Sequence, residues 1–469
     1  MRSAQRPSEK SCTIPGPEPW PLLGNIPGID AKSPWLSYMN WSKTYGGIFL
    51  TTALGFNTVI ISDEKIAHEL LDIRSSKYSA RFFDPTGTFD AYGFESLTAL
   101  MGHSNEWRTH RRIFHQHFRA DAAREYRDMQ LHKVAELVRN ILASPQDYRE
   151  HLEAFASSTI VAAVYGYQAR PVKDPLVQKM THRLEGILKT IGVEKIVAVN
   201  FMPFLQYVPS WLPGGSVNAA VCRESIETLS QEPFASLNET IPESSVPSVG
   251  YSGITRQAQL PDGSENEDQH LVKDVCSSAF AAGVETTAST LYTFVLAMVL
   301  HPEAQARAYA DIVRACGADR IPTFEDREDL PYIDAILRET ERWYPVLPLG
   351  LPHSVSEDDT YGDYFIPKGT TFMVNIWALC HDEERFPRPD DFLPERFLAE
   401  DGTLVKETVD LVFGFGRRVC PGRHFADASL WVAIAALLST FRFERANGAQ
   451  GTDIPFDTEW ASGATLYVI

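Results

Sequence analysis

The amino-acid sequence predicts a mainly α-helical protein with small β-sheets. Three long segments show helical patterning: residues 125–229, 271–299 and 426–441. Short β-type runs at residues 48–51 and 58–61 flank a turn with Gly55, and turn residues within 361–377 are typical of a small β meander. Helices are therefore expected to form the body of the fold, with strands as a minor part.

The composition supports a large core and argues against nucleic-acid binding. Hydrophobic residues make up 44% of the 469 residues, and 61 acidic residues outnumber 43 basic ones, which gives a net charge of −18. Six cysteines without a spacing pattern favour a reducing, cytosol-facing location over a disulfide framework. A chain of this length could hold about three domains of ~150 residues, but no composition break supports a division.

The chain begins with a polar segment, residues 1–13, followed by the proline-rich run 15–25. A membrane span needs ~20 apolar residues and a signal peptide an apolar stretch of about 7–15, and this segment has neither. After the predicted hairpin, Ser62, Asp63 and Glu64 indicate the start of a helix.

Residues 82–105 form a long loop that carries Phe89, Tyr92, Phe94 and Leu97. Loops of this length are usually functional, although an ordinary surface loop is the alternative. The next feature is the pair Trp107 and Arg111, which share a helix face because they are four residues apart. Arginine at such a position suits a carboxylate ligand, but a solvated helix can carry the same pair by chance.

Residues 201–215 are strongly apolar, yet three prolines exclude a continuous helix. They belong either to the core or to an exposed apolar loop. Residues 241–270, rich in Ser, Pro, Gly and acidic residues, predict an exposed connection. The apolar helix 271–299 that follows contains Glu285 and Thr286, which are costly there unless they find partners or act in chemistry. Threonines that hydrogen-bond back to the helix are the alternative.

Glu339 and Arg342 are three residues apart and share the face of a predicted helix. The chain then leaves that helix through Val346 and Leu347 and reaches His353, and Arg396 follows later.

The run from Phe413 to Gly422 places one cysteine, Cys420, between glycines and before the third helix. Gly416 and Gly422 would permit turns and close approach. Pro421 suits the first turn of a helix, which would place the sulfur at a helix N-terminus, where a thiolate is favoured. Such a thiolate is a nucleophile or a metal ligand, and an inert buried cysteine is the alternative. The other five cysteines are expected to be core or surface residues.

This run fits the pattern Phe-x-x-Gly-x-Arg-x-Cys-x-Gly and resembles the heme-binding loop of the cytochrome P450 superfamily. The resemblance implies the cytochrome P450 fold, with heme b (iron protoporphyrin IX) buried between a long central helix and the cysteine loop, and Cys420 as the iron ligand. It implies further cofactor-binding residues: Trp107, Arg111, Ala282, Gly283, His353, Phe413, Arg418 and Gly422. It also implies a structural ion-pair set, Glu339, Arg342 and Arg396, and a substrate pocket lined by Phe89, Tyr92, Phe94, Leu97, Val346 and Leu347.

The implied function is that of a heme-thiolate monooxygenase that inserts one oxygen atom from O2 into a hydrophobic small molecule. Gly283 would make room for dioxygen, and Glu285 and Thr286 would deliver protons to the distal oxygen. Residues 330–353 and 413–430 look most like fungal members that tailor secondary metabolites such as terpenoids, polyketides or aromatics. The chain shows no Gly-x-Gly-x-x-Gly fingerprint, so a separate NADPH-cytochrome reductase is expected to supply the electrons.

The resemblance also bears on organisation and location. We expect a polar tail, residues 1–14, and one domain, residues 15–469, whose C-terminal hairpin looks short. The family's membrane anchor is missing before the proline-rich run. The expected location is therefore the cytosolic face of the endoplasmic reticulum membrane if an anchor was removed, and the cytoplasm otherwise. The apolar loop 201–212 is expected to give peripheral membrane contact.

Two other functions remain open at this stage. One is a heme-thiolate isomerase or dehydratase that needs no reductase, although such members often lose the acid–alcohol pair that this chain keeps. The other is a non-heme metal protein that uses Cys420 and His424 as a zinc pair, although no second pair accompanies them. A last expectation concerns the reductase, which would dock on a basic patch near the cysteine loop formed by Arg108, Arg112, Arg119, Arg417 and Arg423.

Overall fold

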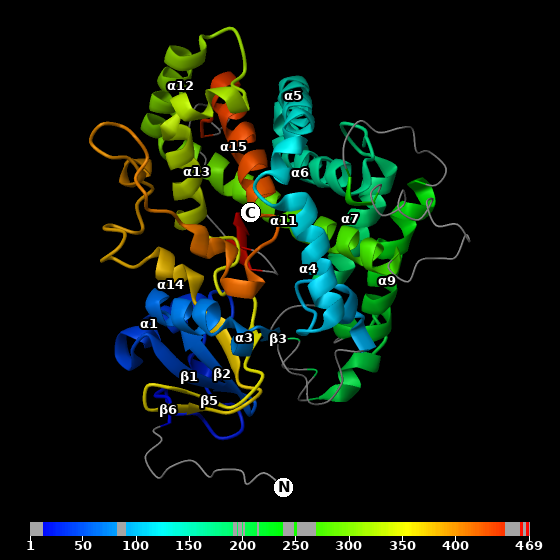
Figure 1. Ribbon diagram of the computed structural model, residues 1–469, viewed down its shortest axis with the longest axis vertical. Helices are drawn as coiled ribbons and strands as arrows, with labels where there is room; N and C mark the ends of the chain where they lie inside the picture. The colour runs from blue at the N-terminus through cyan, green and yellow to red at the C-terminus, as the bar shows by residue number, and fades with distance from the viewer. Residues whose placement is uncertain are drawn as a thin grey trace.

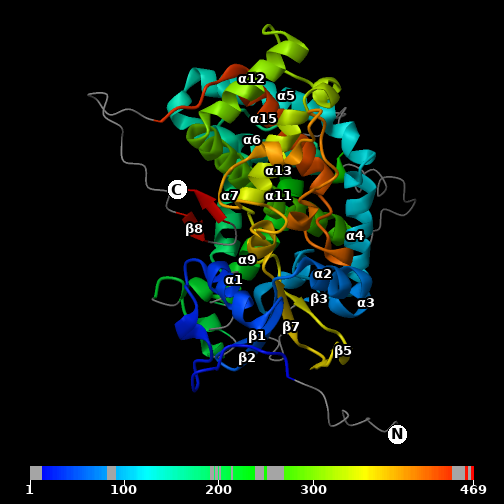
Figure 2. The ribbon, with the colours of Figure 1, turned by 90° about the vertical axis from the view of Figure 1, so that its left-hand side faces the viewer.

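The computed structural model describes residues 13–81, 91–190, 195, 199, 202–212, 215–237, 248–250, 269–445, 460–462 and 466–468. Helices dominate it, and most of the strands gather at one end of the molecule (Figures 1 and 2), so the predicted fold class is confirmed. The α-helices are α1 (Pro34–Tyr45), α2 (Glu64–Ala67), α3 (Ser75–Tyr78), α4 (Asn105–Phe118), α5 (Arg127–Ala143), α6 (Tyr148–Tyr165), α7 (Pro175–Leu188), α9 (Ala219–Leu237), α11 (Gln269–Leu300), α12 (Pro302–Cys316), α13 (Pro331–Trp343), α14 (Ile376–Cys380) and α15 (Arg423–Thr440).

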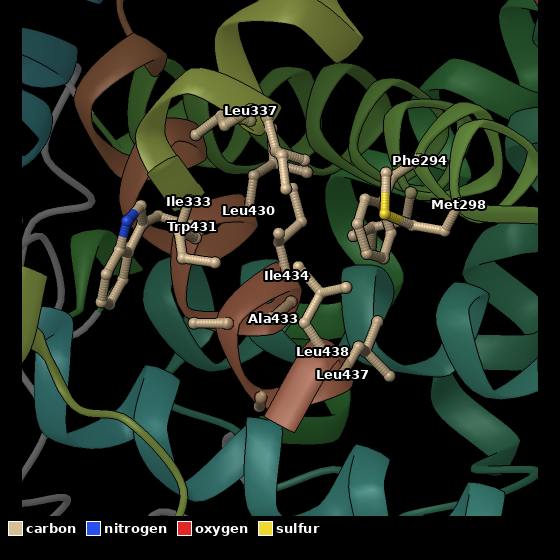
Figure 3. Close-up of a cluster of buried hydrophobic side chains, with 14 of the residues drawn as sticks. Phe294, Met298, Ile333, Leu337, Leu430, Trp431, Ala433, Ile434, Leu437 and Leu438 are labelled. Carbon is tan, nitrogen blue, oxygen red and sulfur yellow. The ribbon is translucent and has the colours of Figure 1, made fainter. Parts of the chain in front are cut away.

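The long helix α11 is the centre of the helical body. It packs against α4, α6, α13 and α15, and most of its residues are apolar and buried. In Figure 3, Phe294 and Met298 of α11 lie near Leu337 of α13 and Ile434 of α15, in one continuous cluster. Among the described residues, α11 is the one helix long and apolar enough to cross a membrane, but 67% of its apolar window is buried inside the protein.

The main sheet joins segments that are distant in the chain. Its strands are β1 (Ile48–Ala53), β2 (Phe56–Ile61), β7 (Thr371–Val374), β4 (His353–Ser354) and β3 (Ala80–Arg81), in that spatial order. The hairpin β1–β2 forms as predicted; Leu54 and Gly55 both have positive φ (49° and 85°), as tight hairpin turns require. In the register of β3 and β4, Arg81 lies opposite His353.

Several local expectations need correction. The segment 361–377 is not one meander, because β5 (Asp359–Tyr361) and β6 (Tyr364–Ile366) pair with each other while β7 joins the main sheet. The C-terminal hairpin is present as β8 (Trp460–Ser462) and β9 (Leu466–Val468), and β9 lies against α11. Of the expected tail 1–14, residues 1–12 lie outside the described residues, and the division into a tail and one domain stays a prediction.

Candidate functional site

The cysteine loop is closed by its own backbone. The amide of Cys420 donates to the carbonyl of Phe413 at 2.8 Å. Gly416 has φ +52°, and a Cβ there would lie 2.1 Å from the carbonyl oxygen of Leu71, so only glycine fits. The expectation for Gly422 was wrong in this respect, because its φ is −90° and a Cβ would meet the Cys420 sulfur at an ordinary 4.0 Å.

The sulfur of Cys420 lies just before α15, although the helix begins later than expected. Its N-cap is Gly422, so Pro421 precedes the helix rather than occupying its first turn. Burial raises the pKa of the Cys420 thiol, while hydrogen bonds from the amides of Gly422 and Arg423 and the charges of Arg111 and Arg423 oppose this. The helix N-terminus thus favours the thiolate form of Cys420, as expected, but the effect of burial is larger and favours the neutral thiol. A cation bound to the sulfur would favour the thiolate again.

A group of buried and half-buried arginine side chains lies beside this loop. Arg418 donates from Nε to the carbonyl of Ser79 at 2.8 Å and from Nη2 to that of Met101 at 2.9 Å, and its guanidinium stacks 4.1 Å from the ring centre of Trp107. Its third nitrogen, Nη1, is buried and has no hydrogen-bond partner. Burial and the nearby charges of Arg81 and Arg111 lower the pKa of Arg418 to about 8.

Trp107 and Arg111 hold their expected positions on α4. The side chain of Ser104 caps the helix by accepting from the Trp107 amide at 3.0 Å, and the Trp107 ring is buried. Arg111 donates to the carbonyl of Val419 at 2.8 Å, which fixes α4 against the residue before Cys420. Burial lowers the pKa of Arg111, and the Cys420 sulfur opposes this shift.

Sequence reasoning missed Arg81, which completes the cationic group. Arg81 donates to the carbonyls of Ala99 (2.7 Å) and Pro352 (2.9 Å), and burial followed by the charge of Arg111 lowers its pKa to about 10. His353 donates from Nδ1 to the carbonyl of Tyr78 at 2.9 Å, and burial together with Arg81 lowers its pKa to about 3. No signal near Arg81 in the chain indicated this role, because it depends on the pairing of β3 with β4.

The expected catalytic residues lie at the middle of α11. Ala282 is exposed although its helix neighbours Phe280 and Val284 are buried, so this side of α11 is not covered by other side chains. Thr286 donates from Oγ1 to the carbonyl of Ala282 at 2.7 Å, the back-bonded arrangement considered as the alternative. Its proton is thereby committed to the helix, while its oxygen can still accept. Glu285, beside it, is half-buried.

Gly283 makes a contact other than the expected one. A Cβ at this position would lie 3.1 Å from Cγ1 of Ile160 on α6, so its lack of a side chain allows α6 and α11 to pack closely. Its expected place beside dioxygen stays a prediction.

The expected ion-pair set is brought together in a fully buried position. Arg342 donates from Nε and Nη2 to the two oxygens of Glu339 at 2.7 and 2.8 Å, and Arg396 approaches the same carboxylate at 3.1 Å. The amide of Leu393 also donates to Glu339, at 2.7 Å. Every oxygen of the carboxylate therefore has a partner, and the set joins α13 to the chain segment 388–397.

The structure describes five of the six residues that were expected to line the substrate pocket. Phe89 lies outside the described residues. Tyr92 and Phe94 are buried and stack at 5.3 Å between ring centres, and Leu97 is buried in the same apolar cluster. Val346 and Leu347, like Phe413 of the cysteine loop, are half-buried. Their roles toward a substrate or cofactor stay predictions.

A mainly helical protein with a cysteine loop at the start of a helix, and with arginines beside it that lack carboxylate partners among the described residues, has the features of a heme-thiolate protein. Comparison with known proteins gives the family: the model of the cytochrome P450 family matches residues 14–464, so the chain belongs to that family. It is similar to cytochrome P450 monooxygenase COX1 of Coprinopsis cinerea, with 34% identity over 96% of this chain and 88% of the relative.

Other relatives are of the same kind. The chain is 34% identical to cytochrome P450 monooxygenase ple1 of Rhodocybe pseudopiperita, over 94% of this chain and 84% of that protein. It is also 34% identical to cytochrome P450 monooxygenase CLM2 of Gibberella zeae, over 96% of this chain and 86% of that protein. All three are fungal, and they identify the chain as a monooxygenase of this family. This membership also decides against a non-heme metal protein built on Cys420 and His424.

The residues present fit the heme-thiolate cofactor that the family implies. Among the described residues, Arg81, Arg111 and Arg418 form no ion pair with a carboxylate, and Arg418 keeps a buried N–H without a partner. Buried cations of this kind are costly unless an anion joins them. Two carboxylates on the edge of a porphyrin would supply it, with Cys420 as the iron ligand.

Proposed function

We propose that this enzyme uses O2 to insert one oxygen atom into a hydrophobic small molecule, with heme b as its cofactor. The observation that carries the proposal is the Cys420 loop beside the buried Arg418 and the half-buried Arg81 and Arg111, which have no carboxylate partner among the described residues. When bound, the heme supplies the activation of O2, and the protein's residues hold it, orient the substrate and move protons. The proposed substrate is a fungal secondary-metabolite intermediate such as a terpenoid, polyketide or aromatic.

The direct test is product formation. Cells that co-express the enzyme with a fungal NADPH-cytochrome reductase would be fed candidate scaffolds, and extracts examined by mass spectrometry. A product that gains one oxygen atom, labelled when the cells breathe 18O2, supports the proposal. An isomerised or dehydrated product without labelled oxygen, formed equally without reductase, would contradict it.

We infer that Glu285 and Thr286 deliver the protons that this reaction needs. Because the Thr286 hydroxyl proton is held by the Ala282 carbonyl, its oxygen would accept a hydrogen bond from a water molecule and hold that water in place, and Glu285 would supply the proton that the water passes on.

Thr286→Ala is therefore expected to uncouple turnover. Without the hydroxyl, NADPH consumption continues but product per NADPH falls by about tenfold or more, and hydrogen peroxide rises in its place. Thr290→Ala is the matched control, because Thr290 lies one turn later on α11 and donates only to the carbonyl of Thr286, at 2.9 Å. Equal coupling in the two variants would contradict the proton-delivery role.

The proposed electron donor is an acidic NADPH-cytochrome reductase that docks on an exposed cationic patch. The patch is smaller than expected: Arg108, Arg112 and Arg417 are exposed, whereas Arg119 pairs with Asp121 at 2.7 Å and Arg423 is half-buried. Arg423 lines a recess of about 620 Å3 behind the cysteine loop that also contains acidic residues, among them Glu341, Asp410 and Asp427. The recess is thus of mixed charge, which leaves the α4 side as the cationic surface.

Arg112→Glu is expected to slow reduction of the enzyme by the reductase several-fold at low salt. Steering between exposed charges weakens as the Debye length falls from ~10 Å at about 0.1 M to ~3 Å at about 1 M salt, so the difference from wild type should vanish at high salt. Stopped-flow reduction measures the rate, and Arg139→Glu on α5, also exposed, is the control. Salt-independent rates, equal in all three proteins, would mean that the reductase docks elsewhere.

We also propose peripheral contact with a membrane through the loop that contains η7 (Pro203–Tyr207). Phe204, Tyr207 and Trp211 are 63%, 75% and 80% exposed, so this apolar segment is not core. Large exposed aromatic side chains gathered in one loop are typical of an interaction surface. The endoplasmic reticulum is the proposed location.

The double variant Phe204→Ser/Trp211→Ser is expected to bind phospholipid vesicles at least about tenfold more weakly than wild type. The variant lacks two large apolar side chains whose transfer from water to the membrane would favour binding. Co-sedimentation with vesicles measures the binding. Leu142→Ser, which removes an equally exposed apolar side chain (62%) from α5, is the control. Unchanged vesicle binding by the double variant would contradict this contact.

A further inference from the structure

The loop between residues 91 and 104 is held by hydrogen bonds on two sides. On its outer side, Arg223 of α9 donates to the carbonyl of Ala91 at 3.2 Å and to Glu95 at 2.9 Å, and both charged side chains are exposed. Tyr92 donates to the carbonyl of Val217 at 2.5 Å. An exposed ion pair contributes little to stability, so the Tyr92 hydrogen bond is the stronger contact on this side.

The inner side of the loop is held by three buried polar residues. The amide of Thr98 donates to Oγ of Ser278 on α11 at 3.0 Å, and the hydroxyl of Thr98 bonds to Nδ1 of His110 on α4 at 2.9 Å. Ser278 in turn donates to the carbonyl of Ser96 at 3.4 Å. We call Thr98, His110 and Ser278 the loop joint; it connects the loop, α4 and α11 at one point.

The loop joint is costly as core packing. His110 is fully buried, its Nε2 has no hydrogen-bond partner among the described residues, and burial lowers its pKa to about 4, so the ring is neutral. A buried polar atom without a partner destabilises the fold, and an apolar side chain at position 110 would avoid that cost. The polar joint therefore needs a reason other than stability.

The positions of its members suggest that reason. Thr98 directly follows Leu97, a proposed pocket residue. His110 lies between Trp107 and Arg111 on the helix face beside the buried arginines. Ser278 lies two turns before Thr286 on α11. The loop joint thus connects one part of the proposed substrate pocket, the cofactor edge and the proton-delivery helix.

We propose that His110 is a positioning residue. It acts through Thr98 to hold the pocket loop in a fixed position relative to α4 and α11. The position of the loop then determines which bulky ligands fit over the cofactor. This rests on the proposed heme-thiolate function. Without the Thr98–His110 hydrogen bond, the loop would be less ordered in the free enzyme. A large ligand that contacts the loop must then order it on binding, which lowers its affinity. A small ligand that does not reach the loop keeps its affinity.

The test compares two azoles that bind heme iron, imidazole and the much larger clotrimazole, by optical titration of the purified full-length enzyme. Thr98→Val and His110→Leu are expected to weaken clotrimazole binding by roughly tenfold and to leave imidazole binding unchanged. Thr98→Ser and His110→Asn, which keep a bonding atom in place, should restore it. The double variant Thr98→Val/His110→Leu should bind no more weakly than either single variant, because both remove the same bond.

Hydrogen exchange gives a second measurement that does not need the cofactor. The Thr98 amide should exchange faster in Ser278→Ala and in His110→Leu. Thr109→Val, which removes a hydroxyl bonded only to the Asn105 carbonyl of its own helix, and His115→Phe, at an exposed position of α4, are the controls. The proposal would be overturned if the double variant lost affinity additively, or if imidazole and clotrimazole binding were weakened equally. It would also be overturned if Thr109→Val and His115→Phe behaved like the variants of the loop joint. Absence of any azole spectrum, in wild type too, would contradict the heme site instead, and hydrogen exchange would still decide about the loop joint.

Discussion

Cys420→Ser is expected to abolish the thiolate-type spectrum of this enzyme. The reduced wild-type protein with carbon monoxide should show the red-shifted Soret band of a thiolate ligand. A serine hydroxyl stays protonated at neutral pH and is a poor ligand for iron, so the variant should lose the band, most of its heme and all oxygen insertion. Heme content by the pyridine method and the carbon monoxide difference spectrum measure both effects.

Cys316→Ser is the matched control for this experiment. Cys316 is the last residue of α12 and only half-buried, so the same substitution there should leave the spectrum unchanged. An imidazole-type spectrum of the wild type, or zinc in place of iron by elemental analysis, would contradict the assignment of Cys420. Retention of the thiolate band in Cys420→Ser would do the same.

The features that the sequence predicted well are those that depend on short stretches of chain. The cysteine loop is such a case: Gly416 has a positive φ of 52°, and that local turn appears in the sequence as a glycine at a fixed distance from Cys420. The helix α11 is another, because a helix that is buried over most of its length must be largely apolar. In both cases the physical cause and its sequence trace lie within one turn or one helix.

The features that sequence reasoning missed depend on contacts between distant segments. Arg81 joins the cationic group only because β3 pairs with β4 in a register that sets it opposite His353. Gly283 is a contact for Ile160 of α6, which nothing near it in the chain indicates. Strand register and helix neighbours are decided by the whole core, so short-range patterns could not assign these roles.

The apolar loop near Trp211 shows a different limit. Core and membrane-facing segments have the same composition, since both remove apolar side chains from water. The sequence alone therefore left the two interpretations open, and the exposed positions of Phe204 and Trp211 favour the second.

The substitution with the largest expected loss of folding stability is Glu339→Ala. This carboxylate is fully buried and accepts hydrogen bonds from Arg342, Arg396 and the Leu393 amide. Removing one member of a buried ion pair costs roughly 3–5 kcal/mol, because the remaining charge has neither a partner nor water. Total stabilities of about 5–15 kcal/mol are usual, so Glu339→Ala should approach the limit of folding.

The design of this experiment separates charge from packing. Glu339→Gln keeps the shape and some hydrogen bonds but leaves Arg342 and Arg396 without a counter-charge, so it should lie near Glu339→Ala. Glu185→Ala is the control, because Glu185 is exposed (57%) and its pair with Lys189 is long, at 3.9 Å; it should cost less than about 1 kcal/mol. Urea unfolding followed by circular dichroism measures all three midpoints. If Glu339→Ala shifts the midpoint no further than Glu185→Ala, the buried set does not hold α13 to segment 388–397, and the stability of this region must come from the apolar contacts around Trp343 and Phe392.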